Sequence, residues 1–154
     1  MNDTLCEVIR KAFAGVKLGK GVGLQEGQGL DDYEDAATCT KYRAKDEKED
    51  WSRIPVAELN RCSSSLSFFD PAGLRFHLPA FLIADLRGEY QGGNVVFHLT
   101  YPANLTGDAF SLLSSAQRSA VRAYLLHVAA DGKEHFSRAD KRALKDYWVE
   151  QAVG

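Results

Sequence analysis

Residues 68–86 form the most apolar and most aromatic stretch of the chain, and they lie near its middle. Asp70 and Pro71 are typical of a helix start, because the carboxylate accepts from free N–H groups of the first turn and proline needs no donor there. Pro79 follows eight residues later, and its ring clashes with the preceding turn and removes one N–H. The stretch therefore predicts two short helices end to end, with a kink or a fresh start at Leu78–Pro79.

The second half of this stretch has the pattern of a buried helix. Residues 80–86 are apolar in nearly every direction of a helical wheel, whereas a surface helix has one polar face. The run is far too short to span a bilayer. We therefore expect it to be the core helix against which the rest of the chain packs.

Composition places the chain among ordinary globular proteins. A length of 154 residues is most simply one domain, 1–154, and 45% apolar with 26% charged residues is a common balance. The net charge of −2 provides no general attraction to nucleic acid or to an anionic membrane, so neither is an expected partner. The three cysteines are odd in number and include no CxxC pair, which argues against a disulfide framework and a zinc site. No secretory leader is recognisable at the start, and we expect a cytoplasmic protein.

Helical patterns precede the central stretch. Residues 4–13 carry apolar side chains on one face, with Asn2, Asp3 or Thr4 as the capping residue and Gly15 past the end. Residues 24–34 are consistent with a short helix that two glycines weaken. A further helix over residues 54–59 is entered through Pro55.

Helical patterns also follow the central stretch. Ser114 with Gln117 is a capping box that opens a helix reaching Ala130, and Ser137 with Asp140 opens the last helix. Between them, residues 95–101 are β-branched and aromatic, which favours a strand. The predicted fold class is mainly α: a single compact helical domain of about five to seven helices, with at most a short β element near residues 95–100.

Charge is distributed unevenly along the chain. Residues 31–50 hold eight acids and four bases, a local net of −4, whereas residues 118–145 hold seven bases and three acids, a net of +4. Oppositely charged faces of this kind guide recognition between proteins. The arginines of the second segment also suit nucleic acid, but a solvated helix face explains them equally well and the chain is not basic overall.

Several ionisable or aromatic residues are candidates for a pocket. Arg75, His77 and Asp85 lie in the most apolar part of the chain, where a charge is costly unless it is paired. One interpretation is a site in which acids from the polar segment complete a histidine–carboxylate constellation. The other is a structural ion pair and helix cap, which we prefer because it produces the same pattern. The candidate pocket residues are Asp31, Asp32, Asp50, Trp51, Arg75, His77 and Asp85.

Other catalytic and metal-binding signatures are missing from the sequence. The four histidines are never spaced at i and i+4, and no HExxH or EF-hand pattern occurs, so we expect no metal. Gly19, Gly21 and Gly23 lack the strand and the spacing of a phosphate loop, and we interpret them as a flexible connection. There is no GxSxG or SxxK motif for a nucleophile. We expect no cofactor, and the question of enzymatic activity stays open.

Three blocks of the sequence resemble an uncharacterised family. They are Asp31-Asp32-Tyr33, then Asp46-Glu47 with Asp50-Trp51, then Phe68-Phe69-Asp70 through Gly73-Leu74-Arg75-Phe76-His77-Leu78-Pro79-Ala80-Phe81. Together they are similar to a group of small, mostly bacterial domains of unknown function, over nearly the whole chain. The resemblance implies a soluble bacterial protein and provides no activity, substrate or catalytic residue.

Two functions of different class are compatible with these patterns. The first is a non-enzymatic interaction protein, of an accessory or immunity type, that binds a protein partner through the acidic 31–50 segment and the basic 118–145 face. The second is an enzyme or small-ligand-binding protein with a pocket around Asp31, Asp32, Arg75 and His77. We favour the first, and the sequence indicates no particular oligomeric state.

Overall fold

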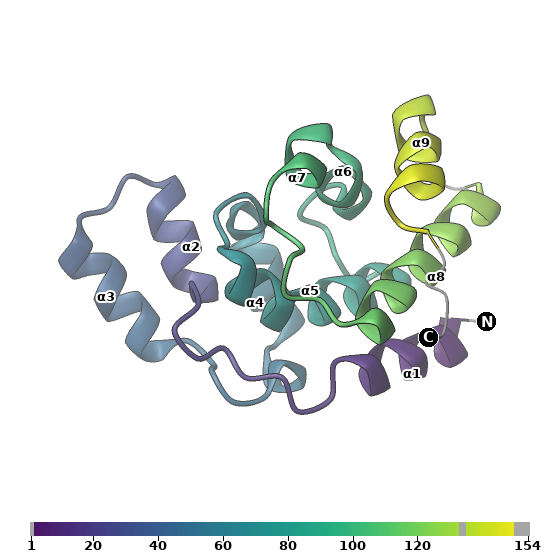
Figure 1. Cartoon of the computed structure of the whole chain (residues 1–154). Helices are drawn as coiled ribbons and strands as arrows, with labels where there is room; N and C mark the ends of the chain where they lie inside the picture. Colours follow the sequence, from purple (N-terminus) through teal and green to yellow (C-terminus); the bar gives the residue numbers. More distant parts are fainter. Residues whose placement is uncertain (1, 133–134, 150–154) are drawn as a thin grey trace.

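A buried central helix, α5, organises the structure, which is a computed structural model that describes residues 2–132 and 135–149 (Figure 1). Helix α5 spans Pro71–Leu86, and twelve of its sixteen residues are buried. In these two ranges all regular elements are helices, so the mainly α prediction is confirmed. None of the described helices has the length and apolar character needed to cross a membrane. That the chain forms one domain over 1–154 stays a prediction.

The start of α5 follows the sequence prediction. Asp70 is the N-cap, and its Oδ1 accepts from the backbone N–H of Gly73 at 2.8 Å, while Pro71 is the first helical residue. The same oxygen accepts from the N–H of Val22 at 2.9 Å. Asp70 therefore caps the helix and also fastens the loop of residues 13–23 to it.

The predicted break at Leu78–Pro79 is wrong, because α5 continues through both residues to Leu86. A proline inside a helix removes one backbone hydrogen bond and costs about 3 kcal/mol in an exposed setting. Here Pro79 is buried, and Leu78, Phe81 and Leu82 around it are nearly or wholly inaccessible to solvent. Packing on every side of the helix offsets that loss.

Helices α1 and α8 cover one side of α5. Helix α1 spans Asn2–Ala12 and packs against both α5 and α8, which spans Ser115–Asp131. The predicted capping box at the start of α8 is confirmed, and the Gln117 side chain also donates to the Ala12 carbonyl of α1 at 3.2 Å. The predicted N-caps Asp3 and Thr4 are wrong, since both lie inside α1. Asn2 is instead the first helical residue, and its amide donates to the Leu86 carbonyl at the end of α5.

The predicted β element near residues 95–100 is also wrong. Val95–Thr100 is the short helix α6, capped by the Asn94 side chain, and α7 follows at Pro102–Thr106. Val95, Val96, Leu99 and Thr100 are buried and lie on one face at helical spacing. The β-branched residues therefore reflect burial in a short helix, and no strand in the described ranges is available as a partner.

Helix α9 is held on α6 by two buried hydrogen bonds. It spans Arg138–Asp146, and the predicted Ser137 capping box is confirmed. The Trp148 indole N–H donates to the Leu99 carbonyl at 2.8 Å, and the Thr100 hydroxyl donates to Asp140 at 2.7 Å. The end of the described chain is thereby fixed against the rest of the fold.

The opposite end of the molecule is a helical hairpin. Helices α2, Leu24–Asp31, and α3, Ala36–Lys45, pack against each other, and α2 also rests on the 3₁₀ helix η2 at Ser63–Ser67. A Cβ on Gly27 would come within 2.8 Å of Ser65, so glycine allows the close approach of α2 to η2. The connection to α5 runs through the 3₁₀ helix η1, Trp51–Arg53, and α4, Val56–Arg61.

Replacing Asp70 with alanine tests its double role. Asp70→Ala removes the acceptor of two N–H groups, and we expect the free energy of unfolding to fall by about 2 kcal/mol in urea titrations. Asp35→Ala is the matched control, because Asp35 caps α3 through exposed contacts with a single residue, Thr38, and joins no other element. Its loss should be clearly smaller, and equal losses would contradict the role of Asp70 in fastening the 13–23 loop.

Candidate functional site

The structure distributes the seven sequence-selected residues over four places. Asp31 and Asp32 lie at the end of α2, and Asp50 and Trp51 lie at η1. Arg75 and His77 belong to the first half of α5, and Asp85 belongs to its last turn. We take these places in turn, because each gives its residues different chemistry.

The turn between α2 and α3 contains four carboxylates and is called the acidic tip here. It comprises Asp31, Asp32, Tyr33, Glu34 and Asp35. Asp32 accepts from the Gln28 amide at 3.3 Å, and Asp35 accepts from the N–H of Thr38 at 2.7 Å as the N-cap of α3. Hydrogen bonds from Thr38 hold the pKa of Asp35 below its usual value. None of the ion pairs found among the described residues includes a carboxylate of the acidic tip.

Tyr33 is the most unusual residue of the acidic tip. Its φ is +58°, and it is the single non-glycine residue with positive φ in the described part of the chain. Its side chain is 96% exposed. A tyrosine in the left-handed region costs about 1–2 kcal/mol relative to a relaxed backbone, and an exposed ring regains none of that through burial.

Asp50 and Trp51 serve the local structure of η1. Asp50 is its N-cap and accepts from the N–H of Ser52 at 3.0 Å and from the Ser52 hydroxyl at 2.6 Å. These two bonds hold the pKa of Asp50 below its usual value. Trp51 is buried, and its indole N–H donates to the Phe13 carbonyl at 2.9 Å, joining η1 to the end of α1.

His77 is sealed inside the core. Its ring is fully inaccessible to solvent and stacks in parallel on Phe69, with the ring centroids 4.3 Å apart. The Nδ1–H donates to the Gly73 carbonyl at 2.7 Å, while Nε2 is buried without a hydrogen-bond partner among the described residues. Burial is the dominant effect and lowers the pKa of His77 to about 4. Nearby, the Nε of Arg75 is likewise buried without a partner in the part of the chain that the structure describes.

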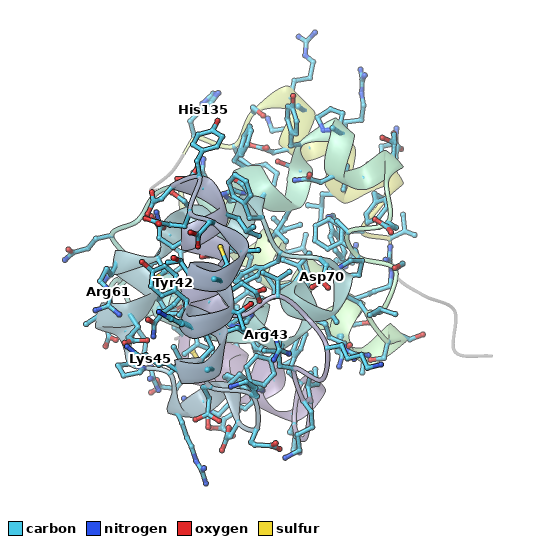
Figure 2. All side chains as sticks on the ribbon, turned by 90° about the vertical axis from the view of Figure 1, so that its left-hand side faces the viewer. Tyr42, Arg43, Lys45, Arg61, Asp70 and His135 are labelled. Carbon is cyan, nitrogen blue, oxygen red and sulfur yellow. The ribbon has the colours of Figure 1, made fainter. Side chains whose placement is uncertain are left out.

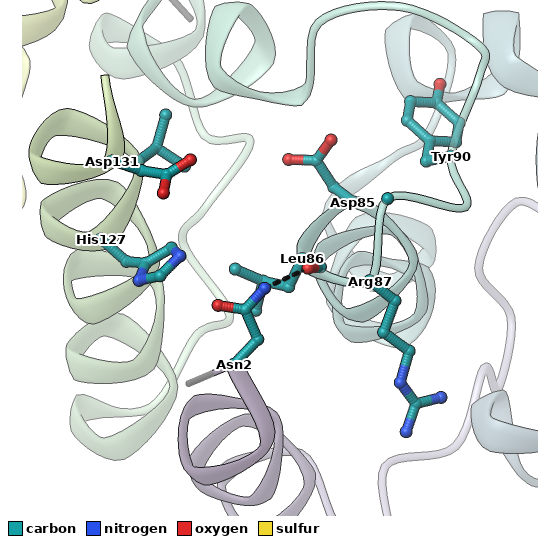
Figure 3. Close-up of a pocket in the computed structure, with 9 residues that line it drawn as sticks. Asn2, Asp85, Leu86, Arg87, Tyr90, His127 and Asp131 are labelled. Atoms are coloured by element: carbon teal, nitrogen blue, oxygen red, sulfur yellow. Dashed lines mark hydrogen bonds between the residues drawn. The ribbon is translucent and has the colours of Figure 1, made fainter. Parts of the chain in front are cut away.

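Asp85 lines a cavity at the C-terminal end of α5 (Figure 3). The Tyr124 hydroxyl, from the buried face of α8, donates to its carboxylate. His127 and Asp131 of α8 line the opposite wall, and Asn2 of α1 lies below. The cavity holds about 510 Å³ and includes none of the other six sequence-selected residues.

The two charged segments lie at opposite ends of the molecule, with the α2–α3 hairpin at one end and α8 and α9 at the other (Figure 1). Seen end-on, this end of the molecule also presents cations, with Lys45 of α3 and Arg61 of α4 at one side and Arg43 of α3 near the middle (Figure 2). At the other end the predicted basic face is only partly free. The Arg118 guanidinium lies 4.7 Å from the ring centroid of Tyr147, and it donates to the carbonyl of that residue at 3.2 Å.

Sequence reasoning missed three residues that the structure makes prominent. Tyr33 had a visible signal, because an aromatic residue flanked on both sides by acids between two helices has no core position to occupy. His127 and Asp131 are four residues apart and therefore share one face of a helix. That spacing is visible in the sequence, but the helix predicted to open at Ser114 reaches only Ala130, one residue before Asp131.

The burial of His77 predicts a specific pH dependence of stability. The pKa of His77 is about 4 in the fold and 6.5 for an ordinary solvated histidine, so between these values the unfolded chain binds a proton that the folded chain does not. The buried neutral imidazole thereby makes the free energy of unfolding depend on pH by about 3 kcal/mol. This stability is fully present above pH 6.5 and is lost as the pH falls towards 4. Urea titrations at pH 7 and pH 4.5 measure how much unfolding free energy is lost between these two pH values. This loss should be smaller in His77→Gln than in the wild type.

Gln91→Ala, a substitution of an exposed and non-ionisable residue, should retain the wild-type pH dependence. NMR provides a second measurement that needs no variant, because the His77 imidazole should not titrate between pH 5 and 8. Titration within that range would contradict a sealed neutral histidine.

Comparison with known proteins identifies a family but no activity. No curated protein and no solved structure matches the chain. The profile of a family described as a family of unknown function (DUF6714) matches residues 1–152. The match agrees with the resemblance inferred from the three sequence blocks, and it covers nearly the entire chain. The chain therefore belongs to this family of unknown function.

Proposed function

We propose that the protein is a cytoplasmic, non-enzymatic interaction protein that binds a basic protein partner through the acidic tip. The observation that carries the proposal is Tyr33, a tyrosine with φ +58° and 96% of its side chain exposed among four carboxylates. As a protein of accessory or immunity type, it would bind a partner that presents lysine or arginine side chains around a pocket for the tyrosine ring.

The backbone of Tyr33 supports this role. Glycine adopts positive φ without steric penalty, so a glycine at position 33 would relieve the strain of this turn. Tyrosine adds strain and gains no packing in return. Residues whose conformational preference conflicts with the fold occur mainly at functional sites. Tyrosine is also among the residues that contribute most binding energy at protein interfaces.

The charge of the tip supports a basic partner. Four carboxylates within five residues repel one another, and no base separates them. Asp32 and Asp35 use oxygens for local hydrogen bonds, but neither of these contacts neutralises the negative charge. Cations of a partner would turn this repulsion into attraction and accelerate the encounter.

The tip is carried on a firm base, which limits the ordering cost of binding. Arg43 of α3 donates to the carbonyls of Gly19 at 2.6 Å and Gly21 at 3.2 Å, which joins the hairpin to the 13–23 loop. Asp70 fastens that loop to α5. The partner would therefore meet a preformed surface.

The alternative function, a pocket around Asp31, Asp32, Arg75 and His77, has less support. Catalysis or ligand binding would need these groups to converge. Asp31 and Asp32 lie at the hairpin turn, whereas His77 is inaccessible inside α5. A neutral buried imidazole with no route to solvent is suited to packing and not to proton transfer with a substrate.

Tyr33→Gly should separate stability from binding. Removing the left-handed strain should raise the free energy of unfolding by about 1 kcal/mol in urea titrations. Tyr101→Gly is the control, because Tyr101 is an exposed aromatic residue with φ −64° that stacks on Phe97. The control should lose stability, and a loss in Tyr33→Gly as well would oppose the strain argument.

Photo-crosslinking followed by calorimetry tests the partner. With p-benzoylphenylalanine at position 33, irradiated cells should yield a crosslinked basic protein that the same probe at Phe97 does not capture. The purified partner is then titrated against a tip variant, Asp31→Asn with Asp32→Asn and Glu34→Gln, in which the Asp35 cap is kept. We expect at least about tenfold weaker binding and a strong dependence on salt.

The matched control removes the same charge elsewhere. Glu89→Gln with Asp108→Asn and Asp146→Asn neutralises three exposed acids outside the tip, so the net charge equals that of the tip variant. Its affinity should stay close to wild type. Equal weakening in both variants would leave only a general charge effect, and the tip would not be the binding surface.

A further inference from the structure

We infer that the cavity at the C-terminal ends of α5 and α8 binds a small organic cation with at least two ammonium groups, such as a diamine or polyamine. This site is at the other end of the molecule from the acidic tip and does not depend on the function proposed above (Figure 1). Nothing in the family description assigns a ligand to it.

The cavity has the size of a small-molecule site. Its volume of about 510 Å³ lies within the range of about 300–1,000 Å³ that is usual for such sites. Three helices contribute walls, and the polar side chains on them come from separate parts of the chain. They are Asn2 of α1, Asp85 and Arg87 at the end of α5, Tyr90, and His127 and Asp131 of α8.

The orientation of the charged groups indicates that the ligand carries positive charge. The carboxylates of Asp85 and Asp131 face each other across the cavity, whereas the Arg87 guanidinium points away from it (Figure 3). The Tyr124 hydroxyl donates to Asp85, so this carboxylate is oriented before any ligand arrives. The space between the two acids is therefore electronegative and favours a cation.

The ends of the helices add to the negative electrostatic potential of the cavity. Helix α5 ends at Leu86 and α8 at Asp131, so both C-terminal ends, which carry partial negative charge, border the cavity. Helix α1 brings its N-terminal end, but Asn2 donates to the Leu86 carbonyl and Asp3 adds a negative charge in the first turn. Among the described residues that line the cavity, the two acids thus meet one arginine, Arg87, whose guanidinium points away (Figure 3).

The spacing of the acids favours ammonium groups over a metal ion. A bound metal needs several ligands within one coordination sphere, and no group of three His, Cys, Asp or Glu residues in the described ranges is placed for that. Separate ammonium groups on a flexible chain can each bind one carboxylate on opposite walls. His127, one helical turn before Asp131 on the wall of α8, provides a further polar contact.

The experiment titrates the full chain with spermidine and with putrescine at low ionic strength, using calorimetry and NMR together. Binding should shift the amide signals of residues 2, 85–88 and 127–131 and leave those of the acidic tip unchanged. Asp131→Asn should weaken the binding of spermidine at least about tenfold, the loss of affinity expected for one charge-assisted contact. Asp85→Asn should do the same while it keeps an oxygen for the Tyr124 hydroxyl.

Two controls distinguish this cavity from the rest of the surface. Asp108→Asn removes one exposed acid elsewhere and should bind spermidine like the wild type. The tip variant with Asp31→Asn, Asp32→Asn and Glu34→Gln should also keep its affinity for spermidine. Failure of the tip variant to bind the protein partner would not affect this result, so the two proposals can fail separately.

Several outcomes would overturn the inference. They are the absence of binding, signal changes centred on residues 31–35, or affinity lost in the tip variant and kept in Asp131→Asn. N-acetyl-lysinamide carries one ammonium group on a peptide-like body and serves as a comparison. Tighter binding of this amide than of spermidine would indicate a site for a lysine side chain and would exclude the small-molecule assignment.

Discussion

The burial of most of α5 is the constraint on which the rest of the structure depends. Its buried residues face several directions, so α1, α4, α6 and η1 pack against it, whereas the α2–α3 hairpin and α9 pack on other elements. The loop of residues 13–23, which precedes the hairpin, also packs closely against α5. A Cβ on Gly73 would lie 2.6 Å from the Val22 carbonyl, so this loop can cross α5 only because residue 73 is glycine. Asp70 then fixes the crossing with its second hydrogen bond.

Local signals in the sequence predicted the helix starts well, whereas the path of the chain within elements depended on tertiary packing. Asp70, Ser114 and Ser137 cap helices where their patterns indicate, because a cap is satisfied by residues three positions away. Pro79 and residues 95–100 were predicted wrongly for one shared reason. Propensity describes an exposed backbone, and both segments are buried by neighbours that no local pattern reveals.

The candidate residues were harder to predict than the fold, since a site requires residues that are distant in sequence to meet. The sequence identified Asp85, but its neighbours His127 and Asp131 come from a helix about forty residues later. For Tyr33 the decisive property is a backbone angle, which the residue type itself disfavours. His77 shows the converse case, because its apolar surroundings indicated burial and the structure places it in the core, with one ring nitrogen lacking a partner among the residues that the structure describes.

The two proposed sites are connected through α5, and this bears on whether they can communicate. The hairpin is fastened near the first turn of α5 by Asp70, and the cavity lies at its last turn, about 24 Å away along sixteen residues. Coupling between sites needs an element with two discrete arrangements that both ligands bias. A helix buried along most of its length, with its cap and its last carbonyl both held by hydrogen bonds, has one arrangement. The fold thus favours two independent sites on a rigid core, in which strain at the acidic tip is confined to the hairpin.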